Sequence, residues 1–295
     1  MKKSTRNKLE FISFRIILFI FRILPYKIVE LIVTNILVFG GMILGIRKKV
    51  AENNLKMVFP DKSKKEINSI MKEMYYLLGK TTAETYFCAP QKLYEKVTLE
   101  GWNNLEKAVA ENKGVILAAG HIGNWELAGR FIARKYKLSV VYKKLRNKYF
   151  NEYTNKLRNK DNVILIDKKH ALKPILKLLA QHYIVTIMID QNAGKDGILT
   201  NFLGHPASTF LGISKIAVKT GTPIVPAIAV RLSDGSNKFI FKEVIDPNNY
   251  DKSPEKIKEL TEKVSLEIEK YILKYPSSWF WVHRRWRGSK KAKKI

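Results

Sequence analysis

The stretch GVILAAGHIGNWELAG, residues 114–129, predicts a buried strand that turns directly into a helix. Its first six residues are apolar and partly β-branched, which is typical of a strand covered on both faces. His121 follows at the turn, and Glu126 falls on the first turn of the expected helix. Because α/β proteins bind their ligands at the carboxyl ends of parallel strands, this corner is a candidate site.

Two interpretations of the corner stay open from the residues alone. Each helical residue turns by about 100°, so two helical positions five residues apart point about 140° away from each other. His121 and Glu126 can therefore meet only if His121 precedes the helix. In that arrangement the Glu126 carboxylate accepts the imidazole Nδ1–H, and Nε2 is free to remove a proton. The same H-x4-E spacing also fits a histidine hydrogen-bonded for structural reasons.

Short apolar runs recur along the chain, and helical segments separate most of them. This alternation predicts an α/β fold with a mainly parallel central sheet flanked by helices. The predicted strands cover residues 114–119, 138–142, 162–166, 184–190, 223–230 and 238–244.

Two helix starts carry their own signals. Ser63 and Glu66 form an S-x-x-E capping box, and apolar residues follow at helical spacing as far as Leu78. Ser253 and Pro254 are the N-cap and first residue of a last amphipathic helix. We expect one α/β domain over residues 51–295, which ends in the basic tail GSKKAKKI.

The most apolar region is residues 11–46, which Pro25 and several charged residues interrupt. Residues 28–46 carry one charge and, as a helix, span roughly 28 Å, close to the thickness of a bilayer core. The segment either crosses the membrane once or lies in its interface, and a buried core helix is the third possibility. A cleaved signal peptide is not expected, because arginines break the run and no cleavage site follows it. Residues 1–50 are thus predicted to be a membrane-associated helical segment.

The charge balance is strongly basic, with 54 Lys and Arg against 26 Asp and Glu, a formal net charge of +28. An anionic partner is expected, either nucleic acid, acidic lipid or acidic protein, unless the lysines only solvate the surface. The single cysteine, Cys88, excludes an internal disulfide and a cysteine-based zinc site. No G-x-S-x-G elbow is present, and GKTT at 79–82 lacks the earlier glycine of a phosphate loop.

A resemblance to one enzyme family extends along nearly the whole chain. GHIGNWE, residues 120–126, resembles the H-x4-D/E block of the glycerolipid acyltransferase superfamily, in the form typical of the lauroyl and myristoyl acyltransferases of lipid A biosynthesis. Lys143 and Lys144 stand where that family commonly has Arg-Pro, and the FPEG-type block of glycerol-phosphate acyltransferases is missing. Further blocks resemble the family in order: residues 141–158, MIDQNAG at 188–194, residues 202–230 and WVHRRW at 281–286.

The resemblance implies an enzyme that moves a fatty acyl chain from acyl carrier protein to a hydroxyl of an anionic glycolipid, a lipid A precursor, without metal or organic cofactor. His121 would be the general base, and Glu126 would fix its tautomer. Arg158 or backbone N–H groups at the helix start would stabilise the oxyanion. Asp190 would orient a base or an acceptor group, or else cap a turn.

The resemblance also suggests where the substrates bind. His283, Arg284 and Arg285 would clamp an anionic headgroup, because guanidinium forks suit phosphate; packing against the neighbouring tryptophans is the alternative. The substrate-binding candidates are Asn124, Tyr142, Lys144, Gln191, His283, Arg284 and Arg285.

The expected location is the inner membrane, with the catalytic domain on its cytoplasmic face. Three alternatives remain: a different phospholipid or glycolipid acceptor, an acyl-coenzyme A donor, and a basic nucleic-acid-binding protein. The last leaves the apolar N-terminus unexplained, so no nucleic-acid partner is expected.

Overall fold

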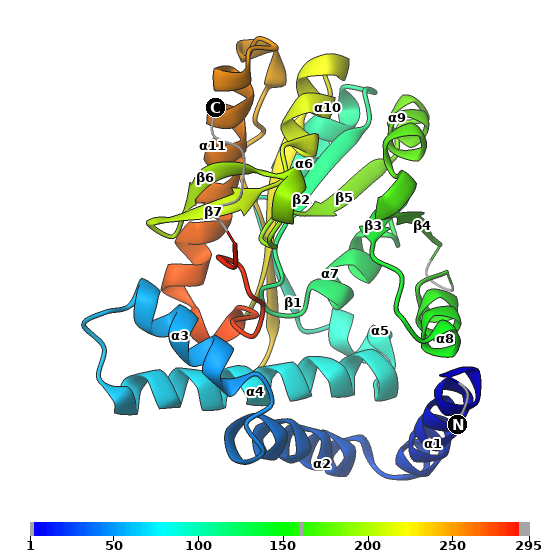
Figure 1. Cartoon of the computed structure of the whole chain (residues 1–295). Coiled ribbons are helices and arrows are strands. Elements are labelled where there is room, and N and C mark those ends of the chain that lie inside the picture. Colours follow the sequence, from blue (N-terminus) through cyan, green and yellow to red (C-terminus); the bar gives the residue numbers. More distant parts are fainter. Residues whose placement is uncertain (1–2, 160–161, 289–295) are drawn as a thin grey trace.

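The computed structural model describes residues 3–159 and 162–288, and a seven-stranded sheet forms its centre (Figure 1). The strand order is β1-β9-β8-β2-β5-β3-β4, and β8 and β9 are the one antiparallel pair of neighbours in this described sheet. The predicted mainly parallel α/β fold is therefore confirmed. The strands of this sheet are β1 (Val97–Glu100), β2 (Val115–Ala119), β3 (Leu138–Tyr142), β4 (Val163–Asp167), β5 (Ile184–Met188), β8 (Ile224–Arg231) and β9 (Asn237–Phe241).

Three strands carried no recognisable sequence signal. β1 is short and three of its four residues are exposed, so it has no apolar pattern. The other two, β6 (Ile198–Phe202) and β7 (His205–Thr209), form a separate antiparallel hairpin. Its two turn residues, Leu203 and Gly204, both have positive φ, and leucine is not a residue that hairpin turns of this kind favour.

Helices cover both faces of the sheet. On one face, Leu105 of α6 and Leu127 of α7 pack against Leu117 of β2. On the other, the helices α9, α10 and α11 form the larger apolar core with Ile116 and Ala118 of β2. The α-helices after residue 47 are α3 (Lys48–Val58), α4 (Lys64–Phe87), α5 (Pro90–Tyr94), α6 (Trp102–Ala110), α7 (Trp125–Ile132), α8 (Lys148–Asn159), α9 (Leu172–Ala180), α10 (Gly212–Thr220) and α11 (Pro254–Lys274).

Both predicted helix starts are confirmed. At the start of α4, the Glu66 N–H donates to Ser63 Oγ at 3.3 Å, and the Ser63 N–H donates to Glu66 Oε2 at 2.8 Å. Ser253 Oγ accepts from the N–H of Lys256 at the start of α11. The predicted basic tail lies, from residue 289 on, outside the described residues.

The sheet divides at its carboxyl edge between β3 and β5. These strands pair only over their first three residues, ending at Val140 and Thr186. On either side the pairing continues further, from β3 to β4 as far as Tyr142 and from β2 to β5 as far as Met188. The two halves of the sheet thus separate where ligands bind in α/β folds.

The apolar N-terminus forms two helices that Pro25 separates, α1 (Lys3–Ile23) and α2 (Tyr26–Val38). A π-helical turn, Phe39–Ile43, continues α2, and Tyr26–Ile43 is long and apolar enough to cross a membrane, with mean hydropathy 1.6. One face of α2 packs closely on α4. A Cβ on Gly79 of α4 would lie 2.6 Å from the Thr34 Cα, so only glycine permits this approach.

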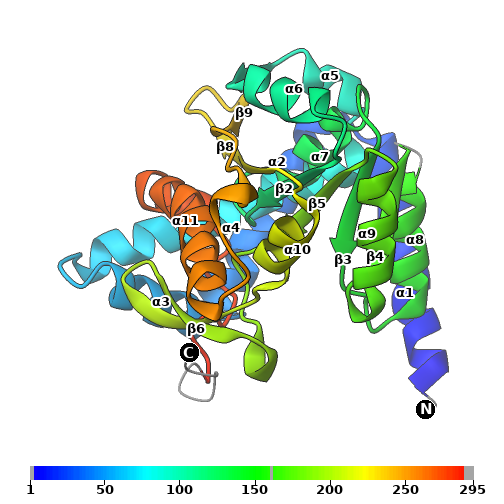
Figure 2. The same ribbon diagram turned by 90° about the horizontal axis from the view of Figure 1, so that it is seen from above.

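The other N-terminal helix, α1, lies against α8 at the β4 edge of the sheet (Figure 2). The contact is aromatic: Phe11 and Phe14 of α1 pack against Tyr149, Phe150 and Tyr153 of α8. Away from these contacts, α1, α2 and the π-helical turn expose large apolar side chains, among them Ile16, Phe19, Ile20, Ile23, Leu31, Ile36, Phe39 and Ile43.

Candidate active site

His121 lies in the turn after β2, and its imidazole is held by Asp190. Nδ1 is 2.8 Å from Asp190 Oδ1, and the His121 backbone N–H donates to Asp190 Oδ2 at 2.7 Å. The indole N–H of Trp279 donates to the same Oδ2 at 2.7 Å. The sequence placed His121 in this turn correctly. The expectation that Glu126 accepts the Nδ1–H is wrong, because Asp190 occupies that position.

The electrostatics of this pair favour an ionised acid beside a basic imidazole. Burial alone would raise the pKa of Asp190, which is 1% exposed, but the charge and hydrogen bonds of His121 and the indole of Trp279 lower it to about 2. Burial likewise opposes the charge on His121, and Asp190 outweighs it, so the imidazole pKa is raised above its usual value. Asp190 therefore remains ionised and holds the proton on Nδ1.

Glu126 binds Arg158 instead of the histidine. Arg158 Nε donates to Glu126 Oε2 at 3.1 Å, and Nη2 donates to Oε1, which makes a two-point ion pair between α7 and α8. Burial alone would lower the pKa of Arg158, but the charge and hydrogen bonds of Glu126 raise it. Both side chains are half-buried. The predicted acid and the predicted oxyanion-stabilising residue are thus each other's partners.

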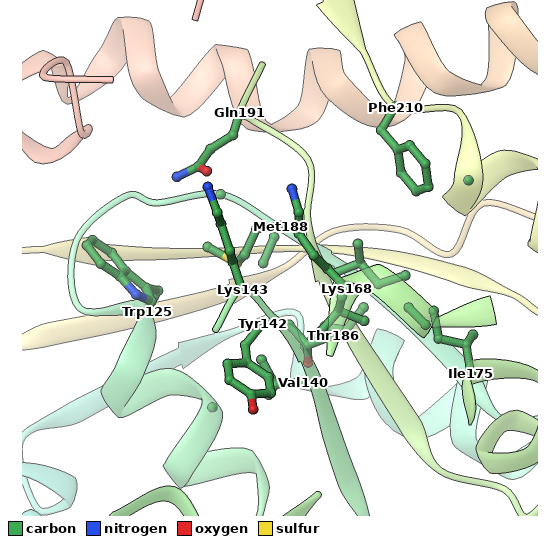
Figure 3. A pocket seen from close by; sticks show the side chains of 18 of the residues that line it. Trp125, Val140, Tyr142, Lys143, Lys168, Ile175, Thr186, Met188, Gln191 and Phe210 are labelled. Atoms are coloured by element: carbon green, nitrogen blue, oxygen red, sulfur yellow. The ribbon is translucent and has the colours of Figure 1, made fainter. Parts of the chain in front are cut away.

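A cavity of about 1660 Å³ opens beside these groups. His121, Glu126 and Arg158 line it, and so do Val140 and Thr186, at the point where β3 and β5 separate. In Figure 3, Trp125 and Ile175 face the cavity from opposite sides. Much of the lining is apolar and comes from both faces of the sheet, for example Leu117, Ile132, Val163, Leu176, Ile187, Ile216 and Phe239.

Two of the predicted substrate-binding residues line this cavity. The Gln191 amide nitrogen is 3.3 Å from His121 Nε2 and 3.5 Å from Nδ1. The Tyr142 hydroxyl accepts a hydrogen bond from the side-chain amide of Asn155 on α8. Both residues thus border the cavity, and their substrate-binding role stays a prediction.

Two other candidates lie outside the lining. Asn124 is buried; its Oδ1 accepts from the N–H of Leu127 as the N-cap of α7, and its Nδ2 donates to Glu84 at 2.6 Å. Lys144 pairs with Asp167 at 3.0 Å, whereas its neighbour Lys143 lines the cavity. The substrate-binding role predicted for the buried Asn124 is therefore wrong, whereas that of the exposed Lys144 stays a prediction.

The C-terminal cluster is mainly structural. Arg285 is 0% exposed; its Nη1 donates to the Ser208 carbonyl at 2.5 Å and its Nη2 to Thr209 Oγ1 at 2.6 Å. Burial lowers the pKa of Arg285 to about 10. It cannot reach a headgroup, so that prediction is wrong. The predicted alternative of aromatic packing describes it better: the guanidinium lies over the Phe202 ring, 4.4 Å from its centroid, and Phe202 packs against Trp279 and Trp286.

The two residues that precede Arg285, His283 and Arg284, are less buried than it is. His283 Nε2 accepts from the N–H of Asn192 at 3.1 Å, and burial lowers the pKa of this imidazole to about 4, so it is neutral near pH 7. His283 is therefore not a cation that could bind an anionic headgroup, and its predicted clamp role is wrong as well. Arg284 is exposed, and its clamp role stays a prediction.

Three aromatic residues that sequence reasoning did not assign surround the pair. Trp125 and Phe280 pack on the His121 ring, with ring centroids at 5.2 and 6.3 Å. Trp279 supplies the indole that binds Asp190. All three belong to aromatic runs visible in the sequence, but only the fold brings residues 279 and 280 beside residue 121.

A metal centre has no support in residues 3–159 and 162–288, where no cluster of three or more His, Cys, Asp or Glu residues could hold an ion. The expectation that no metal or cofactor takes part stays a prediction.

The chain is similar to known acyltransferases along most of its length. It is 25% identical over 269 residues to the lipid A biosynthesis palmitoleoyltransferase of Escherichia coli K12, covering 90% of this chain and 86% of that one. It is 21% identical over 200 residues to the phosphatidylinositol mannoside acyltransferase of Mycolicibacterium smegmatis, covering 66% and 64%. The crystal structure of the 1-acyl-sn-glycerophosphate acyltransferase PlsC from Thermotoga maritima aligns with a TM-score of 0.42 at 16% identity, covering 84% of this chain and 98% of that one.

The family profile of the bacterial lipid A biosynthesis acyltransferases matches residues 3–288, nearly the whole chain. The predicted resemblance is thereby confirmed, and so is the prediction of an O-acyltransferase. The chain belongs to the bacterial lipid A biosynthesis acyltransferase family.

Proposed function

We propose that this protein transfers a fatty acyl chain from acyl carrier protein to a hydroxyl of a lipid A precursor. One observation carries the proposal: His121, bound through Nδ1 to the buried Asp190, lies beside a large and mainly apolar cavity. A histidine held in this way has its Nε2 available to remove a proton. The cavity provides the apolar volume that a fatty acyl chain requires.

In the proposed reaction, His121 Nε2 takes the proton of the acceptor hydroxyl as its oxygen attacks the thioester carbonyl carbon. The Asp190 carboxylate stabilises the imidazolium that forms. When the tetrahedral intermediate collapses, the C–S bond breaks, and the imidazolium returns the proton to the departing thiolate. The products are the acyl ester and the free thiol, so the base is regenerated with each transfer.

The tetrahedral oxyanion requires hydrogen-bond donors close to His121. Among the predicted backbone donors, the Gly123 N–H already donates to the Ser278 carbonyl at 2.9 Å. Arg158 binds Glu126 through Nε and Nη2, which leaves Nη1 for a substrate oxygen. We assign Arg158 the electrostatic role and Glu126 the role of fixing its guanidinium. The Gln191 amide is the second candidate donor.

The acyl chain would enter the opening between β3 and β5. From Asp190 back to Thr186 is four residues of extended chain, about 13 Å, and the lining over this distance includes Val140, Ile187 and Met188. Chain length would be selected by how far this apolar channel extends.

Attachment to the membrane would be through α1 and α2 lying in the interface. One face of α2 does not contact lipid, because Val29 and Val33 are buried and Glu30 pairs with Lys80 of α4 at 3.4 Å, and this one-sided exposure suits a helix that lies in the interface. The exposed apolar residues of both helices would enter one leaflet. The net charge of +28 suits the anionic cytoplasmic leaflet of the inner membrane. We propose residues 1–50 as this attached segment and residues 51–295 as the catalytic domain.

The test is transfer by the purified protein, followed by mass spectrometry of the lipid product, with the His121→Ala variant in parallel. Wild-type protein should add one acyl mass to a lipid A precursor, and the variant should be slower by about 10²- to 10⁴-fold, as general bases typically contribute. Equal rates in the two proteins would refute the mechanism. Because the mannoside acyltransferase is also a relative, a phosphatidylinositol mannoside belongs in the acceptor panel; transfer to it alone would replace lipid A as the acceptor.

A further inference from the structure

Six exposed lysines line the cavity, and we call this set the lysine rim. They come from separate parts of the chain: the end of β3, the 3-10 turn Lys168–His170 after β4, and the helices α9 and α10. All six side chains are exposed and all line the cavity. The lysine rim consists of Lys143, Lys168, Lys169, Lys173, Lys215 and Lys219.

The lysine rim has little local compensation of its charge. None of its six ammonium groups forms an ion pair with a carboxylate of the described residues, whereas the neighbouring Lys144 pairs with Asp167. Of the carboxylates that line the described cavity, Glu126 is held by Arg158, which leaves the exposed Asp196. In Figure 3 the amines of Lys143 and Lys168 point to the side of the cavity where Gln191 lies. Such a concentration of one sign attracts a large anionic partner to the cavity entrance.

The position of the lysine rim indicates which of the two substrates, the soluble acyl donor or the lipid acceptor, would approach it. In Figure 1, α9 and α10, which carry three of the six lysines, lie at the top of the molecule, while α1 and α2 lie at the bottom. The apolar side chains of α1 and α2 would enter the bilayer, so α9 and α10 would face the aqueous phase. A phosphorylated lipid held in that bilayer would approach from the opposite side.

We propose that the lysine rim is the docking surface for a soluble acidic protein that carries the acyl thioester. This inference rests on the proposed function, and it adds that donor and acceptor reach His121 from opposite sides. The acidic carrier would bind across α9 and α10 and extend its thioester arm past Gln191 into the cavity. Exposed charges of this kind act mainly on encounter rate and specificity.

The experiment compares two donors of the same acyl chain, one on acyl carrier protein and one on uncharged pantetheine. The rim variant replaces Lys168, Lys169, Lys215 and Lys219 with Gln and leaves Lys143 unchanged because it lies near Gln191. We expect the KM for the carrier-bound donor to rise roughly ten-fold or more, with kcat at saturation retained, because charge complementarity sets association. The KM for acyl-pantetheine and for the lipid acceptor should change less than about two-fold, since neither uses charge at the rim.

The matched control removes the same number of charges elsewhere. Its four lysines are exposed, form no ion pair with a described carboxylate and do not line the cavity. It should keep the wild-type KM for both donors. The control replaces Lys65, Lys96, Lys107 and Lys252 with Gln.

Four results would overturn the docking surface while the proposed function stands. They are an unchanged carrier KM in the rim variant, an equal rise in the control, an equal rise with acyl-pantetheine, and a rise confined to the lipid acceptor. The last would assign the rim to the lipid headgroup. Wild-type protein that transfers from neither donor would instead overturn the proposed function, and this inference with it.

Discussion

His121 and Asp190 are joined twice, once through the imidazole and once through the backbone N–H of the histidine, although 69 residues separate them. The two contacts fix the position of the ring as well as its tautomer, because the Asp190 carboxylate binds both the imidazole and the backbone N–H of His121. β2 and β5 make this possible, since they are parallel neighbours that end together at Ala119 and Met188. A strand-to-helix corner is thereby held by the end of the next strand in the sheet.

Replacing Asp190 with Asn should lower the rate by about 10²- to 10⁴-fold, because the imidazolium loses its counter-charge. Asp190 raises the pKa of His121, and the base works in its deprotonated form, so activity increases as pH rises through that pKa. Without the charge, the acid limb of kcat/KM should move to lower pH. A pH–rate profile of the residual activity measures this. An unmoved acid limb would mean that another group titrates there.

Glu126 and Arg158 should behave as one unit. Glu126→Gln and Arg158→Gln are each expected to slow transfer, and the double variant should be little worse than either single one, because the second change removes a contact already lost. Coupled ion pairs of this kind give interaction energies of about 0.5–3 kcal/mol in double-mutant cycles. If Glu126→Gln instead shifts the His121 pH profile while Arg158→Gln does not, the carboxylate acts on the histidine directly.

Substitutions of the two neighbouring arginines should have different effects: a change at Arg285 should lower stability, and a change at Arg284 should affect only substrate binding. Arg285→Met removes two buried, charge-assisted hydrogen bonds to β7, so it should cost about 2–4 kcal/mol of unfolding free energy. Arg284→Gln should leave the melting temperature nearly unchanged, because the side chain is exposed. Thermal unfolding in detergent checks both. A raised acceptor KM in Arg284→Gln alone would support its predicted headgroup contact.

His283 should make the fold sensitive to acid. The pKa of His283 is about 4 in the folded protein, against an ordinary value of 6.5. Between these two pH values the imidazole is protonated in the unfolded chain and neutral in the folded one. Its contribution to stability is therefore lost as pH falls from 6.5 to about 4. His283→Gln cannot titrate, and its unfolding free energy should fall less over that range than that of the wild type. Parallel slopes for the two proteins would contradict this assignment.

Membrane attachment should depend on the exposed apolar side chains of α1 and α2. Replacing Phe19 and Leu31, which are 67% and 63% exposed, with Lys should release the protein from anionic vesicles and leave its circular dichroism unchanged. A salt wash should not release the wild type, since salt screens charge and leaves apolar burial intact. Release by salt would show that the attachment is electrostatic.

Local spacing explains what could be predicted from the sequence alone. The alternating strands and helices, the capping box at Ser63, the start at Ser253 and the placement of His121 in a turn all depend on residues within a few positions of one another. Hydrogen bonds and apolar periodicity over such short distances act in the same way whatever the rest of the chain does. The family resemblance was equally visible, because its blocks are ordered along the chain.

The identity of each residue's partner was decided only by the tertiary structure. Glu126 and Asp190 are both acids near the ends of predicted elements, and nothing local shows that β5 brings Asp190 to His121 while α8 brings Arg158 to Glu126. In the same way, the sequence shows Arg284 and Arg285 as equivalent, yet one is exposed and the other is buried under the β6–β7 hairpin that it binds. An ionisable side chain takes the partner that strand order brings within about 3 Å, because its burial is costly without one. That order arises from the packing of the whole chain, which no short stretch of sequence contains.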